Sequence, residues 1–162
     1  MTDTRQASTE DQALVALFEG LDTPGVSDAM DKLGLHGQAL GIMPLANYTR
    51  AVVGPAFTVK YVPASDPPGT VGDYIDDVPP GSVIVLDNGG RDNATVWGDI
   101  LTEIAHRRGI AGTLIDGVCR DVALCLHHDG DGPAHSLQQL QRDAQTGVWS
   151  AVIDRDLSGN YY

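Results

Sequence analysis

The pattern of apolar and polar residues is clearest in the middle of the chain. Residues 82–87 form a short continuous apolar run, which is typical of a buried strand. Residues 94–108 then carry apolar positions three and four apart, which predicts an amphipathic helix that ends at Gly109. A second apolar run over residues 111–116 predicts another buried strand. This order predicts a βαβ unit with two parallel strands, and therefore an α/β fold.

The N-terminal part of the chain carries weaker patterns. Residues 1–10 are polar, and we expect them to be disordered. Residues 11–21 have helical spacing, and Thr23-Pro24 has the residue types of an N-cap and a first helical position, which predicts a second helix that ends near Gly34. The alternation over residues 51–63 predicts a strand interrupted by a Gly-Pro pair.

The sequence after residue 126 has a different character, because the apolar density of the preceding segment is lost. Residues 136–146 are rich in Gln and predict a polar helix, and residues 148–153 predict one short strand. One hypothesis is that the sequence from about His127 onward reflects a shifted reading frame or a truncation. We therefore divide the chain into a disordered N-terminus (1–10), one α/β domain (11–126) and an atypical C-terminal tail (127–162).

Composition and charge narrow the classes of function. The 162 residues, with 42% hydrophobic and 20% charged residues, suit one globular domain. A net charge of −12 disfavours direct binding to nucleic acids or to anionic membranes. The sequence shows no signal peptide, no apolar stretch long enough for a membrane span and only two cysteines, so we expect a cytoplasmic protein.

Residues with useful chemistry collect where the two predicted strands end. Arg120-Asp121 follows the second strand, and a predicted turn at residues 88–90 leads from the first strand into the helix that contains residues 98–101. Ligands of α/β sheets bind at this edge, helix N-termini and Arg favour a carboxylate or phosphate, and Asp121 offers oxygen to a hard cation. A metal ion beside a bound carboxylate can polarise a keto oxygen and stabilise an enolate, as in aldolases and decarboxylases that act on keto acids. An ordinary solvated turn explains Arg120-Asp121 equally well, and residue types and spacing leave both interpretations open.

These residues also carry a family resemblance. The segments Gly89-Gly90, 94–99 (ATVWGD), 108–112 (RGIAG) and 116–121 (DGVCRD) closely resemble the RraA-like family. That family includes class II 4-hydroxy-4-methyl-2-oxoglutarate/4-carboxy-4-hydroxy-2-oxoadipate aldolases and the ribonuclease E inhibitor RraA. The aldolase branch is marked by an Asp, twenty intervening residues and then Arg-Asp, which Asp99 and Arg120-Asp121 match. The resemblance covers roughly residues 11–126.

The resemblance implies a role for each matching residue. The backbone amides of Gly98, Asp99, Ile100 and Leu101, together with the Arg120 guanidinium, would bind the carboxylate and keto group of a pyruvate-like substrate. Asp121 would bind Mg²⁺ or Mn²⁺, mostly alongside water. Asp99 would orient water at the metal or help to move protons.

The resemblance also implies a reaction and an assembly. The reaction would be retro-aldol cleavage of 4-hydroxy-4-methyl-2-oxoglutarate-like keto acids to pyruvate, with oxaloacetate decarboxylation as a side activity. The fold would be a compact α/β/β sandwich that forms homotrimers or hexamers. The alternative is a non-catalytic RraA-like protein that regulates ribonuclease E-type RNA degradation through protein contacts, and the strong acidity keeps it open. The Asp99 to Arg120-Asp121 spacing favours the enzyme.

Overall fold

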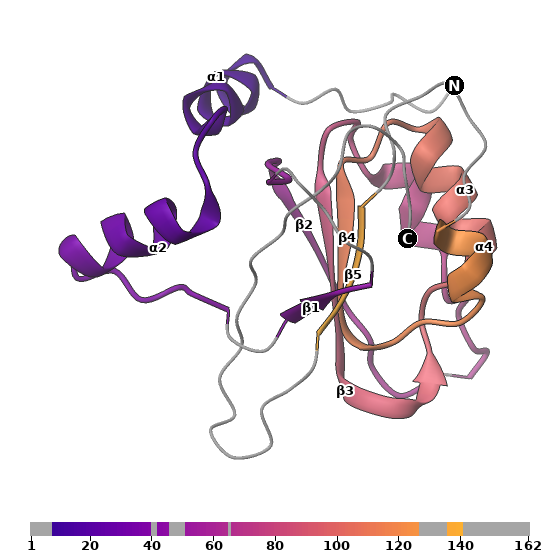
Figure 1. The fold of residues 1–162 in the computed structure, drawn as a ribbon. Coiled ribbons are helices and arrows are strands. Elements are labelled where there is room, and N and C mark those ends of the chain that lie inside the picture. The colour runs from indigo at the N-terminus through magenta and orange to yellow at the C-terminus, as the bar shows by residue number, and fades with distance from the viewer. Residues whose placement is uncertain (1–7, 40–41, 46–50, 65, 127–135, 141–162) are drawn as a thin grey trace.

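The computed structural model describes residues 8–39, 42–45, 51–64, 66–126 and 136–140, which form helices around one mixed sheet (Figure 1). The helices are α1 (Thr9–Phe18), α2 (Thr23–Lys32), the 3-10 helix η1 (Asp73–Asp77), α3 (Asp99–Arg107) and α4 (Val122–Leu126). The strands are β1 (Ile42–Pro44), β2 (Ala56–Lys60), β3 (Val83–Thr95), β4 (Gly112–Val118) and β5 (Ser136–Leu140).

The sheet confirms the predicted α/β class. Its strand order is β1-β5-β4-β3-β2, with parallel pairing throughout except for β1, which runs antiparallel to β5 at one edge. Strands β3 and β4 pair in parallel from Val83↔Gly112 to Asp87↔Asp116, and α3 connects them, so the predicted βαβ unit is confirmed. Helices α3 and α4 lie together on one face of this sheet (Figure 1).

The hydrophobic core lies between the sheet and these two helices. Ile84, Leu86 and Ile115 of the central strands are fully buried, and Ala105 of α3 packs into the same cluster. Full burial of each large aliphatic side chain contributes about 1.5–3 kcal/mol. The βαβ unit therefore has a well-packed core that can hold the residues of a site in fixed positions.

The connection between β3 and α3 differs from the prediction. The sequence predicts that residues 88–90 end the strand and that the helix begins at Ala94, and both expectations are wrong. Strand β3 continues to Thr95 through two register shifts, because Gly89 and Gly90 adopt positive φ angles of 65° and 67° and let the strand bulge instead of ending. Helix α3 begins only at Asp99.

The N-terminal helices also begin differently from the prediction. Helix α1 starts at Thr9, because Ser8 and Asp11 form a reciprocal capping box, and residues 1–7 lie outside the described residues. The N-cap of α2 is Asp22 and not Thr23, since the Asp22 carboxylate accepts from the Gly25 amide at 2.8 Å. The helix ends as predicted near Gly34, which has a φ of 67°.

The prediction of a polar helix over residues 136–146 is wrong for residues 136–140. Residues Ser136–Leu140 form β5, which pairs with β4 on one side and with β1 on the other. The backbone groups of β4 need a partner along this edge, and that tertiary requirement overrides a weak local preference for helix. The predicted strand at 148–153 lies outside the described residues. Within the described part of the chain, no helix is long and apolar enough to cross a membrane.

Candidate active site

The structure brings the predicted site residues together at the carboxyl edge of β3 and β4. Gly98 to Leu101 form the start of α3, and Arg120 and Asp121 lie in the short connection between β4 and α4. The Arg120 backbone N–H donates to the Trp97 carbonyl oxygen at 3.0 Å. This hydrogen bond joins the two segments directly, as the parallel strand order leads one to expect.

Gly98 allows the two segments to approach each other closely. Its backbone is extended, with φ of −165°, and it is the N-cap of α3. A Cβ atom at this position would lie 3.2 Å from Asp121 Oδ2 and 3.3 Å from Arg120 Cγ. A larger residue would therefore push the Arg120 and Asp121 side chains away from the start of the helix.

Arg120 and Asp121 form an ion pair that faces solvent. Arg120 Nε lies 3.1 Å from Asp121 Oδ2, and the two side chains are 66% and 38% exposed. Such a pair contributes about 0–1 kcal/mol to stability. Asp121 has a φ of 56°, in the left-handed region, and its carbonyl accepts the first α4 hydrogen bond from Cys125 N at 2.9 Å. The pair is thus held in place by backbone geometry while remaining accessible to a ligand.

Asp99 occupies the first turn of α3. Its Oδ1 accepts from the Ile100 backbone N–H at 2.8 Å, and Gly98 provides no side-chain cap. The first-turn N–H groups of a helix attract carboxylates, and here one of them already binds the carboxylate of the chain itself. The Ile100 side chain is 67% exposed, whereas Leu101 is half-buried and packs toward Gly72.

Two residues that the sequence analysis did not single out form the buried floor of this site. Thr102 Oγ1 accepts from Trp97 Nε1 at 2.8 Å and donates to the Gly98 carbonyl at 3.0 Å. Cys125 Sγ donates to the Arg120 carbonyl at 3.5 Å. The only sequence signal for Thr102 is a Thr four residues after a helix-capping Gly, which is a weak one.

The two cysteines are packed thiols. Burial, with a smaller effect of Cys125, raises the pKa of the Cys119 thiol to about 11. Burial also raises the pKa of Cys125; a hydrogen bond with Thr102 partly opposes this effect, and the Asp99 and Asp121 carboxylates add to it. Because nucleophilic attack requires the thiolate, neither thiol is suited to that role near neutral pH. The available chemistry lies with Asp99, Arg120, Asp121 and the backbone amides.

The carboxylates of the site fit only a water-rich cation site. Among the described residues, no group of three or more His, Cys, Asp or Glu side chains is placed to hold a metal ion. Zinc sites require three or four such ligands. Mg²⁺ retains several waters and is usually bound through one or two carboxylates, which is the donor set that Asp121, with Asp99 nearby, can provide.

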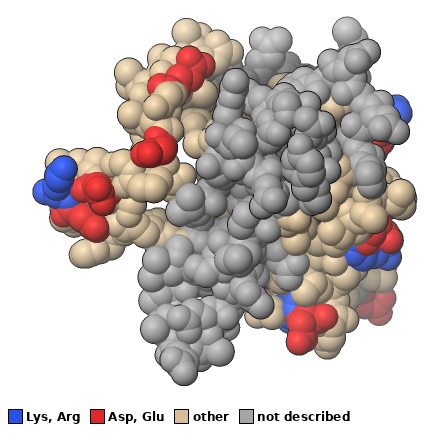
Figure 2. Space-filling model, in the orientation of Figure 1, with Lys and Arg blue, Asp and Glu red and all other residues tan. Residues whose placement is uncertain are grey.

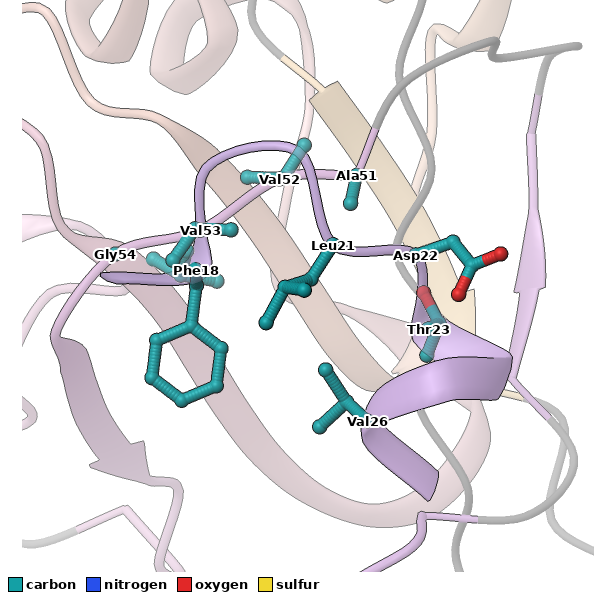
Figure 3. A pocket seen from close by; sticks show the side chains of 10 residues that line it. Phe18, Leu21, Asp22, Thr23, Val26, Ala51, Val52, Val53 and Gly54 are labelled. Carbon is teal, nitrogen blue, oxygen red and sulfur yellow. The ribbon is translucent and has the colours of Figure 1, made fainter. Parts of the chain in front are cut away.

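A hollow of about 260 Å³ lies away from these residues, between the N-terminal helices and the segment before β2 (Figure 3). Phe18, Leu21, Val26 and Val53 line it with apolar side chains. The Asp22 carboxylate at its rim is already used as the cap of α2. The hollow lacks the convergent polar groups of a substrate site and marks loose packing between α1, α2 and the body of the molecule.

The charged residues on the face shown in Figure 2 do not form a basic surface. Among the described residues on that face, Lys and Arg side chains are scattered between Asp and Glu side chains. This distribution agrees with the net charge of −12 and offers no continuous surface for a phosphate backbone there.

Two known proteins have sequences similar to part of this chain. "Protein DlpA" of Legionella pneumophila is 46% identical over 101 residues, which are 60% of this chain and 16% of that protein. A Halalkalibacterium halodurans protein named "Putative 4-hydroxy-4-methyl-2-oxoglutarate aldolase" is 37% identical over 108 residues, 67% of this chain and 49% of that protein. The chain thus spans about half, or less, of the length of these relatives.

Two crystal structures share the fold. A protein from Pseudomonas syringae pv. tomato is 40% identical, with a TM-score of 0.65 over 86% of this chain and 59% of that one. Streptomyces coelicolor RraAS2, described as an unusual member of the RNase ES inhibitor RraA family, is 21% identical, with a TM-score of 0.68 over 97% of this chain and 78% of that one. At this identity, the second likeness concerns the fold alone.

A family model described as RraA-like, Aldolase/RraA, matches residues 23–149. The match includes α2, the whole βαβ unit and β5, and it extends past residue 126, where the sequence resemblance is expected to end. The chain belongs to the RraA-like family.

Proposed function

We propose that this chain carries the catalytic edge of a divalent-metal-dependent aldolase, a lyase that cleaves 4-hydroxy-4-methyl-2-oxoglutarate-like keto acids to pyruvate, with oxaloacetate decarboxylation as a side activity. The observation that carries the proposal is the approach of Arg120 and Asp121 to the Gly98 start of α3, within 3.2–3.4 Å of a Cβ position there. The aldolase name of the 37% identical relative supports it.

Substrate binding would use the positive groups of this edge. The Arg120 guanidinium is a planar donor that matches a carboxylate, and the amides of Asp99, Ile100 and Leu101 stand at the positive end of the helix dipole. The Ile100 amide now donates to Asp99 Oδ1 at 2.8 Å. A substrate carboxylate would take over this donor, and the Asp99 carboxylate would be released toward the substrate.

The chemical step is a carbon–carbon cleavage. The hydroxyl proton is removed, a C=O bond forms at the hydroxyl-bearing carbon, and the C–C bond from that carbon to the methylene beside the keto group breaks. The electron pair of the broken bond moves onto the pyruvate fragment as an enolate, which is then protonated to pyruvate. A divalent cation, when bound, supplies positive charge that stabilises an enolate. Asp121 would hold that cation, Arg120 would bind the carboxylate and keto oxygen, and the released Asp99 would accept or return the proton.

Assembly into homotrimers or hexamers is part of the proposal. Helices α1 and α2 contain no buried residue, and Leu17 and Leu33 are 72% and 73% exposed. Leu14, Phe18, Leu21 and Leu35 in the same region are also at least 40% exposed, and a group of exposed apolar side chains, unlike a single one, is typical of a surface that another protein covers. We propose that other copies of the chain cover them in a cytoplasmic enzyme that contacts neither nucleic acid nor membrane.

The test is release of pyruvate, coupled to lactate dehydrogenase, from 4-hydroxy-4-methyl-2-oxoglutarate and from oxaloacetate. We expect turnover with Mg²⁺ that EDTA abolishes, and a loss of at least about 100-fold in kcat/KM for Asp121→Ala. The control is Asp77→Ala, an exposed acid on η1, which should behave as the wild type. Absence of Mg²⁺-dependent turnover of both substrates would reject the enzyme and favour a binding protein of the RraA type.

A further inference from the structure

A buried network beneath the candidate site centres on Thr102, which is 1% exposed. Its hydroxyl accepts from the indole Nε1 of Trp97 at 2.8 Å and donates to the Gly98 carbonyl oxygen at 3.0 Å. The Thr102 backbone N–H donates to the same carbonyl at 3.0 Å. Two donors from one residue therefore fix the carbonyl that directly precedes the first turn of α3.

Trp97 connects this network to the other half of the site. Its side chain, 2% exposed, reaches down to Thr102, while its own carbonyl accepts from the Arg120 backbone N–H at 3.0 Å. The Trp97 carbonyl and the Gly98 carbonyl belong to consecutive peptides, so a backbone shift at these two residues would move both the Arg120 contact and the first amide of α3. The hydroxyl of Thr102 restrains both residues, Trp97 through its indole N–H and Gly98 through its carbonyl oxygen.

An ordinary role for a Thr in a helix is a hydrogen bond to the carbonyl four residues earlier. Such a bond is common and has little consequence, because the helix already satisfies that carbonyl. Thr102 differs, since its oxygen is also the acceptor for a buried indole N–H. Valine has nearly the same shape but would leave that N–H without this acceptor, and serine would retain both bonds.

We infer that Thr102 is a positioning residue, whose hydroxyl holds the Trp97 indole and the Gly98 carbonyl, on either side of the Trp97–Gly98 peptide, and thereby directs the first α3 amides and Arg120 toward one bound carboxylate. The identity of the ligand rests on the proposed function. The restraint of the Arg120 and α3 backbones by the Thr102 hydroxyl does not rest on the proposed function. The ligand and the restraint can therefore be tested separately.

The experiment compares Thr102→Val with Thr102→Ser by two measurements. The first is amide hydrogen exchange, in which we expect Thr102→Val to accelerate exchange at Arg120 at least about tenfold relative to the core amide of Ile115. The second is oxaloacetate turnover with Mg²⁺, in which we expect KM to rise about tenfold while kcat changes less than about threefold. Loss of groups that bind substrate and transition state equally raises KM alone. Thr102→Ser should stay within about twofold of the wild type in both measurements.

A second pair of variants covers the case in which Thr102→Val does not fold. Trp97→Phe removes the indole N–H, so adding Thr102→Val to it leaves no indole N–H without an acceptor. Because the hydroxyl acts through the indole, we expect Trp97→Phe alone to raise KM and Arg120 exchange, and the added Thr102→Val to change them little further; wild-type values in Trp97→Phe would overturn the inference.

The outcomes separate this inference from the proposed function. Unchanged KM and unchanged Arg120 exchange in a folded Thr102→Val protein would overturn the inference, and so would a fall in kcat with no change in KM, which is the sign of a merely structural role. If the wild type turns over neither substrate, the proposed function fails, and exchange alone decides. Selective acceleration at Arg120 then supports the positioning role, and its absence overturns it.

Discussion

The βαβ unit and the pair of N-terminal helices differ in where their apolar side chains lie. In the βαβ unit, Ile84, Leu86 and Ile115 are fully buried between the sheet and α3. In α1 and α2 no residue is buried, and Leu17 of α1 and Leu33, the C-cap of α2, are more than 70% exposed. Figure 1 shows the two helices standing away from the sheet. Apolar residues at helical spacing thus predict a helix in both regions, but they do not predict its packing partner.

This difference explains why the candidate site lies where it does. A site needs backbone groups held within a fraction of an ångström, and only dense packing provides that. The start of α3 and the Arg120 loop are both hydrogen-bonded to the buried residues Trp97 and Thr102. The exposed N-terminal helices instead offer a surface for assembly.

The largest expected effect compares a core residue with an exposed one. Ile115→Ala should lower the free energy of unfolding by about 3–4 kcal/mol, because it removes a fully buried side chain and leaves a cavity. Leu17→Ala on α1 should change it by less than about 0.5 kcal/mol in a dilute, monomeric sample. Urea denaturation of both variants measures this, and equal effects would contradict the distinction between the two regions.

The next effect concerns the charge at the edge of the βαβ unit. Arg120→Met should reduce kcat/KM for pyruvate release about 100-fold, because the substrate carboxylate loses its charged donor. The melting temperature should stay within about 2 °C, since the Arg120 side chain is 66% exposed. Arg107→Met, which removes an exposed arginine that pairs with Glu103 on α3, is the matched control. Equal activity of the two variants would remove Arg120 from the site.

Gly98→Ala tests the close approach of the two segments. The added Cβ would lie 3.2 Å from Asp121 Oδ2, so the exposed side chains must shift by a few tenths of an ångström. We expect kcat/KM to fall about tenfold. Gly69→Ala is the control, because nothing lies within 4 Å of a Cβ built there. A Gly98→Ala enzyme as active as this control would show that the spacing has no importance.

The smallest effect is a pH dependence from Cys119, whose pKa burial raises to about 11. The same thiol titrates near about 8.5 in the unfolded chain. As pH rises through this window, the unfolded state loses the proton while the folded state keeps it, so stability decreases. We expect the free energy of unfolding to fall by about 1 kcal/mol between pH 8 and pH 10, which is about half of the full linkage value because solvent screens this partly exposed thiol.

Cys119→Ala should make this pH dependence shallower without removing it, because the pKa of Cys125 is also raised. Urea titrations at each pH measure the slope. An identical slope in the wild type and in Cys119→Ala would show that the thiol does not titrate as described.

The parts of the fold that could be predicted are those set by local sequence. Two continuous apolar runs around an amphipathic segment are enough to indicate the parallel βαβ unit, and Gly109, with a φ of 67°, ends the helix as expected. The convergence of Asp99, Arg120 and Asp121 then follows from the strand direction alone. Their catalytic and metal-binding roles stay predictions.

The remaining features depend on contacts between distant segments. The Gln-rich strand β5 forms because β4 presents an edge to be paired, which no local pattern of residues 136–140 reveals. The continuation of β3 past Gly89 and Gly90 depends on pairing with Gly117 and Val118 of β4. The contact of Thr102 with the Trp97 indole depends on side-chain packing in the core.

The central claim is that one edge of the sheet holds a carboxylate and a cation together. Calorimetric titration with oxalate, a stable mimic of the pyruvate enolate, tests it most directly in the presence of Mg²⁺ or of EDTA. If the claim is right, Mg²⁺ should tighten oxalate binding to the wild type at least about tenfold. Mg²⁺ should have no effect on Asp121→Asn, because that variant lacks the carboxylate proposed to hold the cation beside the oxalate. Equal oxalate affinity with Mg²⁺ and with EDTA in the wild type would contradict it.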